Sequence, residues 1–288
     1  MAATAKTPQL PPHAYFLVSA VFHYLGPAFA VLLFSRVEVL GVAWLRIASA
    51  AAIFAVWRRP WRLALRMSRQ QWTTLLALGT SLGVMNACFY LAISRLPLGT
   101  VGAIEFLGPI AVAAAGARTL RNFAALALAV GGVYVLTDIR IAGELTGFLF
   151  AFANCALFIL YIVLGHRIAR DGGAAGIDRL SIAMLVALVV ITPIGFAGAD
   201  PALSNPLLLG AGIGVGVCSS VIPYVMDQLA MARLSRATFA LMLALLPAIA
   251  VAIGAVMLHQ LLSPIELAGV TLVILGVAVH RDPGSAQA

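Results

Sequence analysis

The sequence predicts an all-α integral membrane protein whose ten transmembrane helices form two inverted five-helix repeats. Three observations carry this prediction: the composition, the recurrence of long apolar segments, and a match between the two halves of the chain. Of the 288 residues, 62% are hydrophobic and only 10% are charged, against about 25% charged in a soluble domain. Because charged side chains are costly in hydrocarbon, this composition indicates a chain adapted to lipid and argues against a soluble protein with a large core.

Apolar segments of about 20 residues, long enough to cross a bilayer, recur along the whole chain. Between charged or Pro/Gly breaks they predict ten helices, over residues 14–34, 38–57, 71–94, 98–117, 121–137, 145–165, 177–197, 206–231, 235–258 and 264–280. Residues 1–13 are polar and proline-rich, and no clear cleavage site follows the first apolar segment. We therefore expect a short tail before a retained first helix, not a removed signal peptide.

The basic residues predict the orientation. The net charge is +8, and the arginines sit in short clusters between apolar segments, which is typical of cytoplasmic loops and argues against nucleic-acid binding. With the N-terminus inside, fourteen basic residues lie on the cytoplasmic side and three on the other, while Arg46 falls within the second apolar segment. We expect residues 1–13 and 281–288 to be cytoplasmic tails.

Matches at a fixed offset relate the two halves. Arg95-Leu96, Thr100 and Pro109 are each followed 138 residues later by Arg233-Leu234, Thr238 and Pro247. This predicts repeats over residues 14–141 and 142–280. An odd number of helices per repeat forces opposite orientations, an arrangement that favours a transporter with its site near the midplane.

Two acidic residues stand out inside apolar segments, where a charge is expensive and marks a functional candidate. Glu105, early in the fourth segment, is the leading candidate for proton coupling and for pairing with a substrate amine, since an unpaired carboxylate in hydrocarbon favours its protonated form. Asp227, expected nearer the cytoplasmic interface, is the second candidate. The structural alternatives are pairing of Glu105 with Arg46 and of Asp227 with Arg233.

Other polar side chains repeat at helical spacing and so share helix faces. They predict a central substrate cavity to which both acids also belong, lined by Asn86 and Tyr90, by Asn154 and Tyr161, and by Ser220, Tyr224 and Gln228. Hydrogen bonding between helices is the alternative for each. His23 and Arg46 are interpreted as packed, interfacial or paired residues.

Several other features bear on packing and chemistry. Pro109 and Pro247 predict paired helix kinks beside the cavity, although kinks without a gating role remain open. The pairs Gly79-xxx-Gly83 and Gly210-xxx-Gly214 permit close helix packing. Metal-binding, nucleophile and phosphate-loop motifs are missing from the sequence, so we expect no enzyme, no metal and no cofactor. Transport by this chain alone would have to draw on a gradient.

At this point the residues resemble the EamA branch of the drug/metabolite transporter superfamily over nearly the whole chain. The segment from Tyr90 to Pro109, with its Glu105-Phe-Leu-Gly-Pro, is similar to the third and fourth spans of bacterial threonine/homoserine exporters. The segment Ser219-Ser-Val-Ile-Pro-Tyr-Val-Met-Asp227-Gln is similar to their eighth span, with Asp in place of the family's Glu. The resemblance implies export of amino acids coupled to protons.

Three interpretations stay open. The chain is an amino-acid exporter, a transporter of the same fold for drugs, purines or sugar-like metabolites, or a membrane scaffold or lipid-active enzyme. For the first we expect a small-molecule substrate, protons and membrane lipid as partners, no nucleic acid, and a monomer or weak homodimer. An arginine- and alanine-rich composition with one lysine suggests a bacterial inner membrane.

Overall fold

The computed structural model describes residues 11–96, 98, 101–102, 104–107, 119–136, 145–243, 245–257 and 264–279. Within these ranges every regular element is a helix, so the all-α prediction is confirmed for the part described. Six helices there are long and apolar enough to cross a membrane by length and composition. The ten-helix count goes beyond this finding, because most of residues 98–117 lies outside the described residues.

The first half of the chain follows the predicted boundaries within a few residues. Its helices are α1 (Pro12–Leu33), α2 (Val39–Arg58), the short α3 (Trp61–Ala64), α4 (Arg69–Ile93) and α6 (Leu120–Leu136). The start of α4 is set by a capping box, in which the Ser68 side chain accepts from the Gln71 backbone N–H and the Gln71 side chain accepts from the Ser68 N–H. Between α4 and α6, residues 104–107 are helical and carry Glu105.

The second half has the same kind of long helices with two interruptions. The elements are α7 (Leu145–Ala169), α8 (Gly173–Gly195), η1 (Ala197–Ala199), α9 (Asp200–Leu203), α10 (Pro206–Gly216), η2 (Val217–Val221), α11 (Ile222–Met231), α12 (Arg236–Met242), α13 (Leu245–Met257) and α14 (Pro264–Val279). The predicted helix over 206–231 contains a π-helical turn, η2. The predicted helix over 235–258 is divided into α12 and α13.

Both interruptions precede a proline. Proline has no N–H, so it leaves the carbonyl four residues earlier without its helical donor. Pro223 has this effect on Ser219, which lies in the π-helical turn, and Pro247 has it on Leu243, which follows α12. Local proline chemistry therefore explains departures that a hydropathy pattern cannot show.

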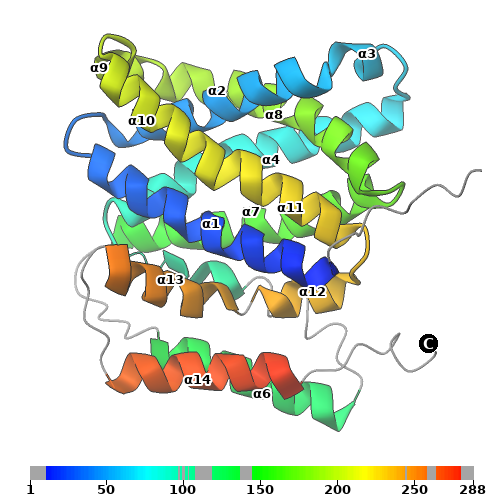
Figure 1. Cartoon of the computed structure of the whole chain (residues 1–288), viewed down its shortest axis with the longest axis vertical. Helices are drawn as coiled ribbons and strands as arrows, with labels where there is room; N and C mark the ends of the chain where they lie inside the picture. Colours follow the sequence, from blue (N-terminus) through cyan, green and yellow to red (C-terminus); the bar gives the residue numbers. More distant parts are fainter. Residues whose placement is uncertain are drawn as a thin grey trace, which may run out of the picture.

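The long helices run roughly parallel in one bundle, with the paired helices α6 and α14 at one side of it (Figure 1). Helix α4 packs along α7 and α8, α2 packs along α8, and α1 packs along α11. The contact of α4 with α8 is close because both members of the first glycine pair face it. A Cβ on Gly79 would lie 2.5 Å from the Ala183 carbonyl, and one on Gly83 would lie 3.0 Å from the Ala187 carbonyl.

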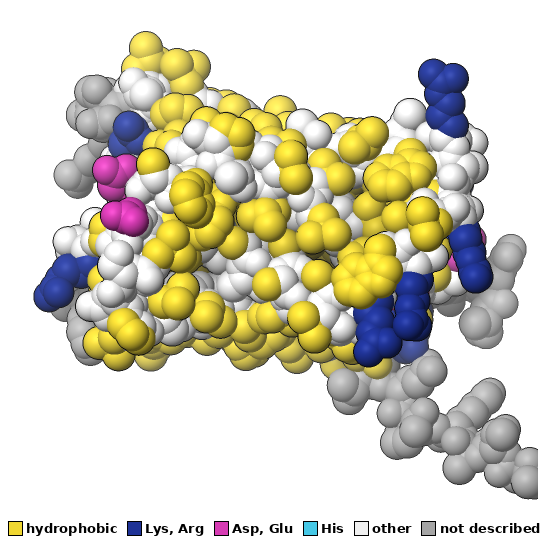
Figure 2. Space-filling view, turned by 90° about the horizontal axis from the view of Figure 1, so that it is seen from above, with side chains coloured by type: hydrophobic (Ala, Val, Ile, Leu, Met, Phe, Trp, Pro, Cys, Tyr) yellow, Lys and Arg dark blue, Asp and Glu magenta, His cyan; other side chains and the backbone are white. Residues whose placement is uncertain are grey.

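The outer surface is that of a membrane protein. Figure 2 shows hydrophobic side chains along the length of the bundle and charged side chains gathered at its two ends. Leu32, Val56, Val189 and Leu207 are 59%, 78%, 72% and 81% exposed, which is unfavourable in water and favourable in lipid. At one end Arg58 pairs with Asp178 at 2.5 Å, and Arg179 pairs with Asp171.

Candidate functional site

The predicted polar residues lie in the interior of the bundle. At most 4% of the surface is exposed in each of Asn86, Tyr90, Glu105, Asn154, Tyr161, Ser220, Tyr224, Asp227 and Gln228. Pro109 lies outside the described residues, and Pro247 is described only as part of the backbone of α13. Burial alone does not separate a cavity from packed helix contacts, so the partners of each side chain decide its place.

A small cavity lies between α1, α2, α4, α7, α11 and the segment 104–107. Its volume is about 10 Å³, room for about one water molecule. The apolar part of its wall comes from Pro27, Met85 and Phe89. The polar part comes from six side chains, His23, Arg46, Asn86, Glu105, Asn154 and Tyr224. The conformation described is therefore closed around its polar centre.

Glu105 has one occupied and one free carboxylate oxygen. Its Oε1 accepts from Asn154 Nδ2 at 2.9 Å. Its Oε2 is buried and accepts no hydrogen bond from the described residues, with His23 Nε2 3.7 Å away. The alternative pairing with Arg46 is wrong, because no described contact brings the guanidinium within 4.0 Å of this carboxylate. Glu105 can thus accept a proton or a cationic group on the side of Oε2.

Asp227 differs from Glu105 because both of its oxygens are occupied. Ser19 donates to Oδ1 at 2.5 Å and Tyr161 donates to Oδ2 at 2.6 Å. Asp227 is 4% exposed, so its carboxylate is surrounded by protein and not by water. Its expected partner, Arg233, instead lies over the Tyr15 ring at 5.5 Å. These two hydrogen bonds tie α1 and α7 to α11.

Arg46 is the residue whose place the sequence reasoning missed. It is 5% exposed and lines the cavity, and its described partners are hydrogen-bonding groups and not an acid. Its Nε donates to Ser220 Oγ at 2.8 Å, and one amino group donates to the Ser219 carbonyl at 2.7 Å and to Tyr224 at 3.4 Å. The signal was present, because an arginine inside an apolar segment is as expensive as the acids that were singled out.

The Ser219 carbonyl is available to Arg46 for a local reason. Pro223 has no N–H to donate to it, and Ser219 and Ser220 both lie in the π-helical turn. Such turns are frequent at functional sites because they re-aim side chains and free backbone groups. The Ser-x-Ile-Pro-Tyr segment thus supplies the groups that accept hydrogen bonds from the buried guanidinium.

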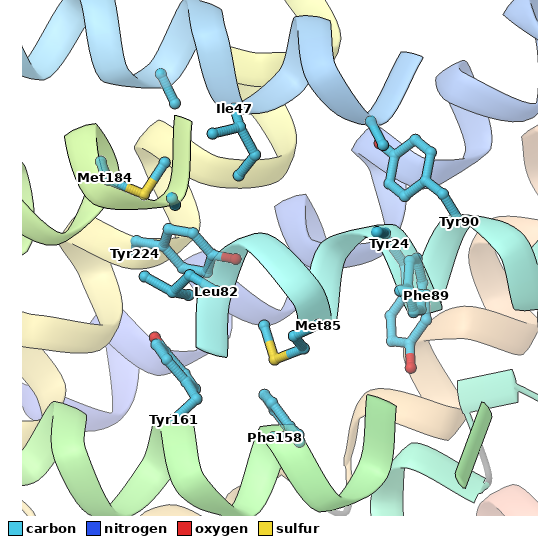
Figure 3. Close-up of a cluster of buried hydrophobic side chains, with 14 of the residues drawn as sticks. Tyr24, Ile47, Leu82, Met85, Phe89, Tyr90, Phe158, Tyr161, Met184 and Tyr224 are labelled. Carbon is cyan, nitrogen blue, oxygen red and sulfur yellow. The ribbon is translucent and has the colours of Figure 1, made fainter. Parts of the chain in front are cut away.

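Aromatic rings pack between α7 and α11 beside the cavity. Tyr161 and Tyr224 approach each other from α7 and α11, with ring centroids 5.6 Å apart, and Phe158 stacks on Tyr161 at 5.7 Å (Figure 3). Tyr161 donates to Asp227, whereas Tyr224 faces Arg46. The two buried acids therefore lie in different surroundings.

Gln228 lies away from the cavity. Its Nε2 is 3.8 Å from Met231 Sδ, and a Cβ on Gly176 would lie 2.5 Å from its Oε1. Asn86, in contrast, lines the cavity with neither of its buried side-chain polar atoms hydrogen-bonded to a described residue. Among the residues that the structure describes, no group of three or more metal-ligating side chains is found.

These features define a multi-pass helical membrane protein with a closed polar site in its interior. The model of the EamA-like transporter family matches residues 145–280. The threonine/homoserine exporter RhtA of Escherichia coli (strain K12) is 34% identical over 97% of this chain and 92% of its own length, and RhtA of Salmonella typhimurium (strain SL1344) is 32% identical over 98% and 96%. The chain belongs to the EamA-like transporter family.

A solved crystal structure shares the fold. It superposes with a TM-score of 0.65 over 92% of this chain and 96% of the other, at 17% sequence identity. At that identity the likeness concerns the arrangement of the helices and not the chemistry of the site.

Proposed function

We propose that this protein exports small amino acids of the threonine and homoserine type across a bacterial inner membrane, by proton-coupled alternating access. Its relatives over nearly the whole chain are named as exporters of these two amino acids. The cavity suits such cargo, because its polar wall presents an amine acceptor, a guanidinium and two side-chain amides.

The single observation that carries the coupling mechanism is the free oxygen of Glu105. Oε2 is buried and accepts no hydrogen bond from the described residues, while Oε1 is held by Asn154. A proton and a substrate ammonium would compete for this one oxygen. Competition for one carboxylate is the minimal requirement for antiport, since the proton that enters must release the amino acid that leaves.

Ten helices in two inverted repeats would supply the alternating access. If α1, α2, α4 and α6 correspond to α7, α8, α10–α11 and α14, the main contacts between these helices have their exchanged counterparts. Helix α4 packs on α7 as α11 packs on α1, α4 packs on α8 as α10 packs on α2, and the pairs α2–α8 and α6–α14 correspond to themselves. A pseudo-twofold axis in the membrane plane produces this pattern. The family match over residues 145–280 agrees with a second repeat there.

Two further helices, α6 and α14, are nearly long enough to cross the hydrocarbon core. Helices α6 and α14 have 17 and 16 residues, or about 25 Å at 1.5 Å per residue, somewhat short of the ~30 Å hydrocarbon core. With ten spans, both termini would be cytoplasmic, on the side that carries the larger number of arginines.

Counterflow in proteoliposomes tests the function. Vesicles are preloaded with unlabelled threonine, and uptake of labelled threonine, homoserine, a purine and a sugar is measured at equal pH and with an imposed pH gradient. We expect accelerated uptake of the two amino acids alone, and accumulation against a concentration gradient when the pH gradient is present. Uptake of the purine or sugar only, or of none of the four, would contradict the proposal.

A further inference from the structure

We propose that Arg46 binds the carboxylate of the substrate while Glu105 accepts its ammonium group, so that the site takes α-amino acids as zwitterions. This inference rests on the proposed function and names the chemistry that selects its cargo. It is carried by the surroundings of Arg46 and by the composition of the cavity wall.

Arg46 is a buried cation held by neutral groups. Its hydrogen bonds go to two hydroxyl groups and a carbonyl, and its guanidinium lies over the Tyr90 ring at 5.6 Å. None of these bonds uses Nη1. Removing a guanidinium from water costs several kcal/mol unless an anion compensates it, and among the described residues no carboxylate lies within 4.0 Å of it. The direct partners of Arg46 are therefore neutral groups, which orient the guanidinium without forming an ion pair.

In the wall of the same cavity, Glu105 supplies the opposite charge and has one carboxylate oxygen without a hydrogen bond from a described residue. Its free Oε2 and the guanidinium of Arg46 both border the water-sized space. The buried Oδ1 of Asn154 and both side-chain polar atoms of Asn86 also lack hydrogen-bond partners among the described residues. The wall therefore holds the guanidinium of Arg46, the carboxylate of Glu105 with His23 3.7 Å from it, and amide groups without hydrogen-bond partners among the described residues.

A zwitterionic amino acid satisfies this wall as one molecule. Its carboxylate can accept a charge-assisted hydrogen bond from Nη1 of the guanidinium, the nitrogen that none of the described hydrogen bonds of Arg46 uses. Its ammonium group can donate to Glu105 Oε2 and to Oδ1 of the Asn154 side chain. The ammonium and carboxylate groups carry opposite charges on one carbon atom, so a bound amino acid adds no net charge to the interior.

The same arrangement excludes other cargo. An amine without a carboxylate leaves Arg46 unpaired, and purines or sugars compensate neither charge. Sites built to bind a polar group reject analogues that lack it much more strongly than apolar pockets reject a missing methylene, because their own buried groups are left unpaired. Selectivity at this site should therefore depend on the free carboxylate more than on the side chain of the amino acid.

The first experiment uses the unaltered protein. Counterflow of labelled threonine is measured against unlabelled threonine and against threoninamide, which keeps the amine and side chain but has no carboxylate. We expect threoninamide to compete at least ~100-fold more weakly than threonine. Equal competition would overturn the inference while leaving amino-acid export intact, whereas the absence of threonine counterflow would overturn the proposed function itself.

The second experiment assigns the carboxylate to Arg46. Arg46→Gln should raise the half-saturating threonine concentration by ~10-fold or more, as expected for the loss of a charge-assisted pair, and should bring the threonine-to-threoninamide ratio close to one. Arg46→Lys keeps a cation and should retain part of the preference. The exposed Arg95, which lies over Phe150 at 5.5 Å, supplies the control Arg95→Gln, with an unchanged ratio.

The ratio separates binding from folding, because a purely structural role would reduce transport of both compounds equally. A correctly inserted Arg46→Gln protein with an unchanged ratio would overturn the assignment. Failure of both Arg46 variants to fold would also count against it, since it would make the guanidinium a structural group.

Discussion

At the scale of single residues, Glu105 and Asp227 are both buried acids with different hydrogen-bond partners. Glu105→Gln is nearly isosteric but cannot cycle a proton. We expect it to reduce threonine transport driven by a pH gradient by at least ~10-fold, a barrier of about 1.4 kcal/mol, while counterflow without a gradient persists at a higher half-saturating threonine concentration. The exposed acid Glu38 provides the control Glu38→Gln, which should keep both activities. Full gradient-driven transport by Glu105→Gln would remove the acid from its proposed role.

Asp227 should behave as a structural acid. Asp227→Asn replaces one acceptor oxygen with an amide, so one of the two donors, Ser19 or Tyr161, meets the wrong partner. Mispairing of a buried polar group costs about 1–3 kcal/mol, and we expect a lower melting temperature in detergent with the pH-gradient coupling retained. Loss of coupling at unchanged stability would exchange the roles of the two acids.

At the scale of elements, the two glycine pairs differ although their sequence spacing is the same. Gly79→Ala would place a Cβ 2.5 Å from the Ala183 carbonyl, whereas Gly214 has no described atom within 4 Å of the equivalent position. We expect Gly79→Ala to force α4 from α8 and lower the melting temperature. Gly214→Ala should leave it unchanged or raise it, because alanine is favoured over glycine in helices by up to about 1 kcal/mol. The reverse order would show that the α4–α8 contact is looser than described.

The π-helical turn η2 makes a second prediction at this scale. Pro223→Ala restores an N–H four residues after Ser219 and allows a regular helix, which competes with Arg46 for that carbonyl. Removing an interior proline relieves up to ~3 kcal/mol of helix strain. We expect a more stable protein that transports threonine more slowly, measured by thermal unfolding and counterflow on the same preparation. Unchanged transport would separate the turn from the function of the site.

The sequence predicted the bounds of the helices better than it predicted the surroundings of their side chains. The boundaries of α2, Val39–Arg58, differ by one residue from the predicted 38–57, because lipid imposes a simple rule of length and polarity on each span. Length and polarity do not reveal that residues 235–258 are divided into α12 and α13. Helix periodicity also placed Tyr224 and Gln228 on one face, but α11 contacts α1, α7 and α8. Side chains on one face of such an enclosed helix can therefore contact different neighbours. Of these two residues, Tyr224 lines the cavity and Gln228 does not.

At the scale of the whole molecule, the topology is open to a direct test. In a background with Cys88, Cys155 and Cys218 replaced by alanine, single cysteines at positions 6 and 285 should react with maleimide only after the inner membrane is permeabilised. A cysteine replacing Arg36, in the connection between α1 and α2, should react from outside in intact cells. Labelling of either terminus from outside would contradict the proposed inverted repeat.

The water-sized cavity also bears on when an exporter works. Under the proposed function, threonine would bind only to the fraction of molecules that have opened, because it cannot enter a space of about 10 Å³. The apparent dissociation constant is the intrinsic one divided by that fraction, which makes a tight site respond as a weak one. With a high apparent dissociation constant, efflux becomes appreciable only when the amino acid inside the cell is in surplus. If the chain exports amino acids as proposed, this closed centre would act as an overflow threshold and would spare a cell the loss of amino acids that it still needs.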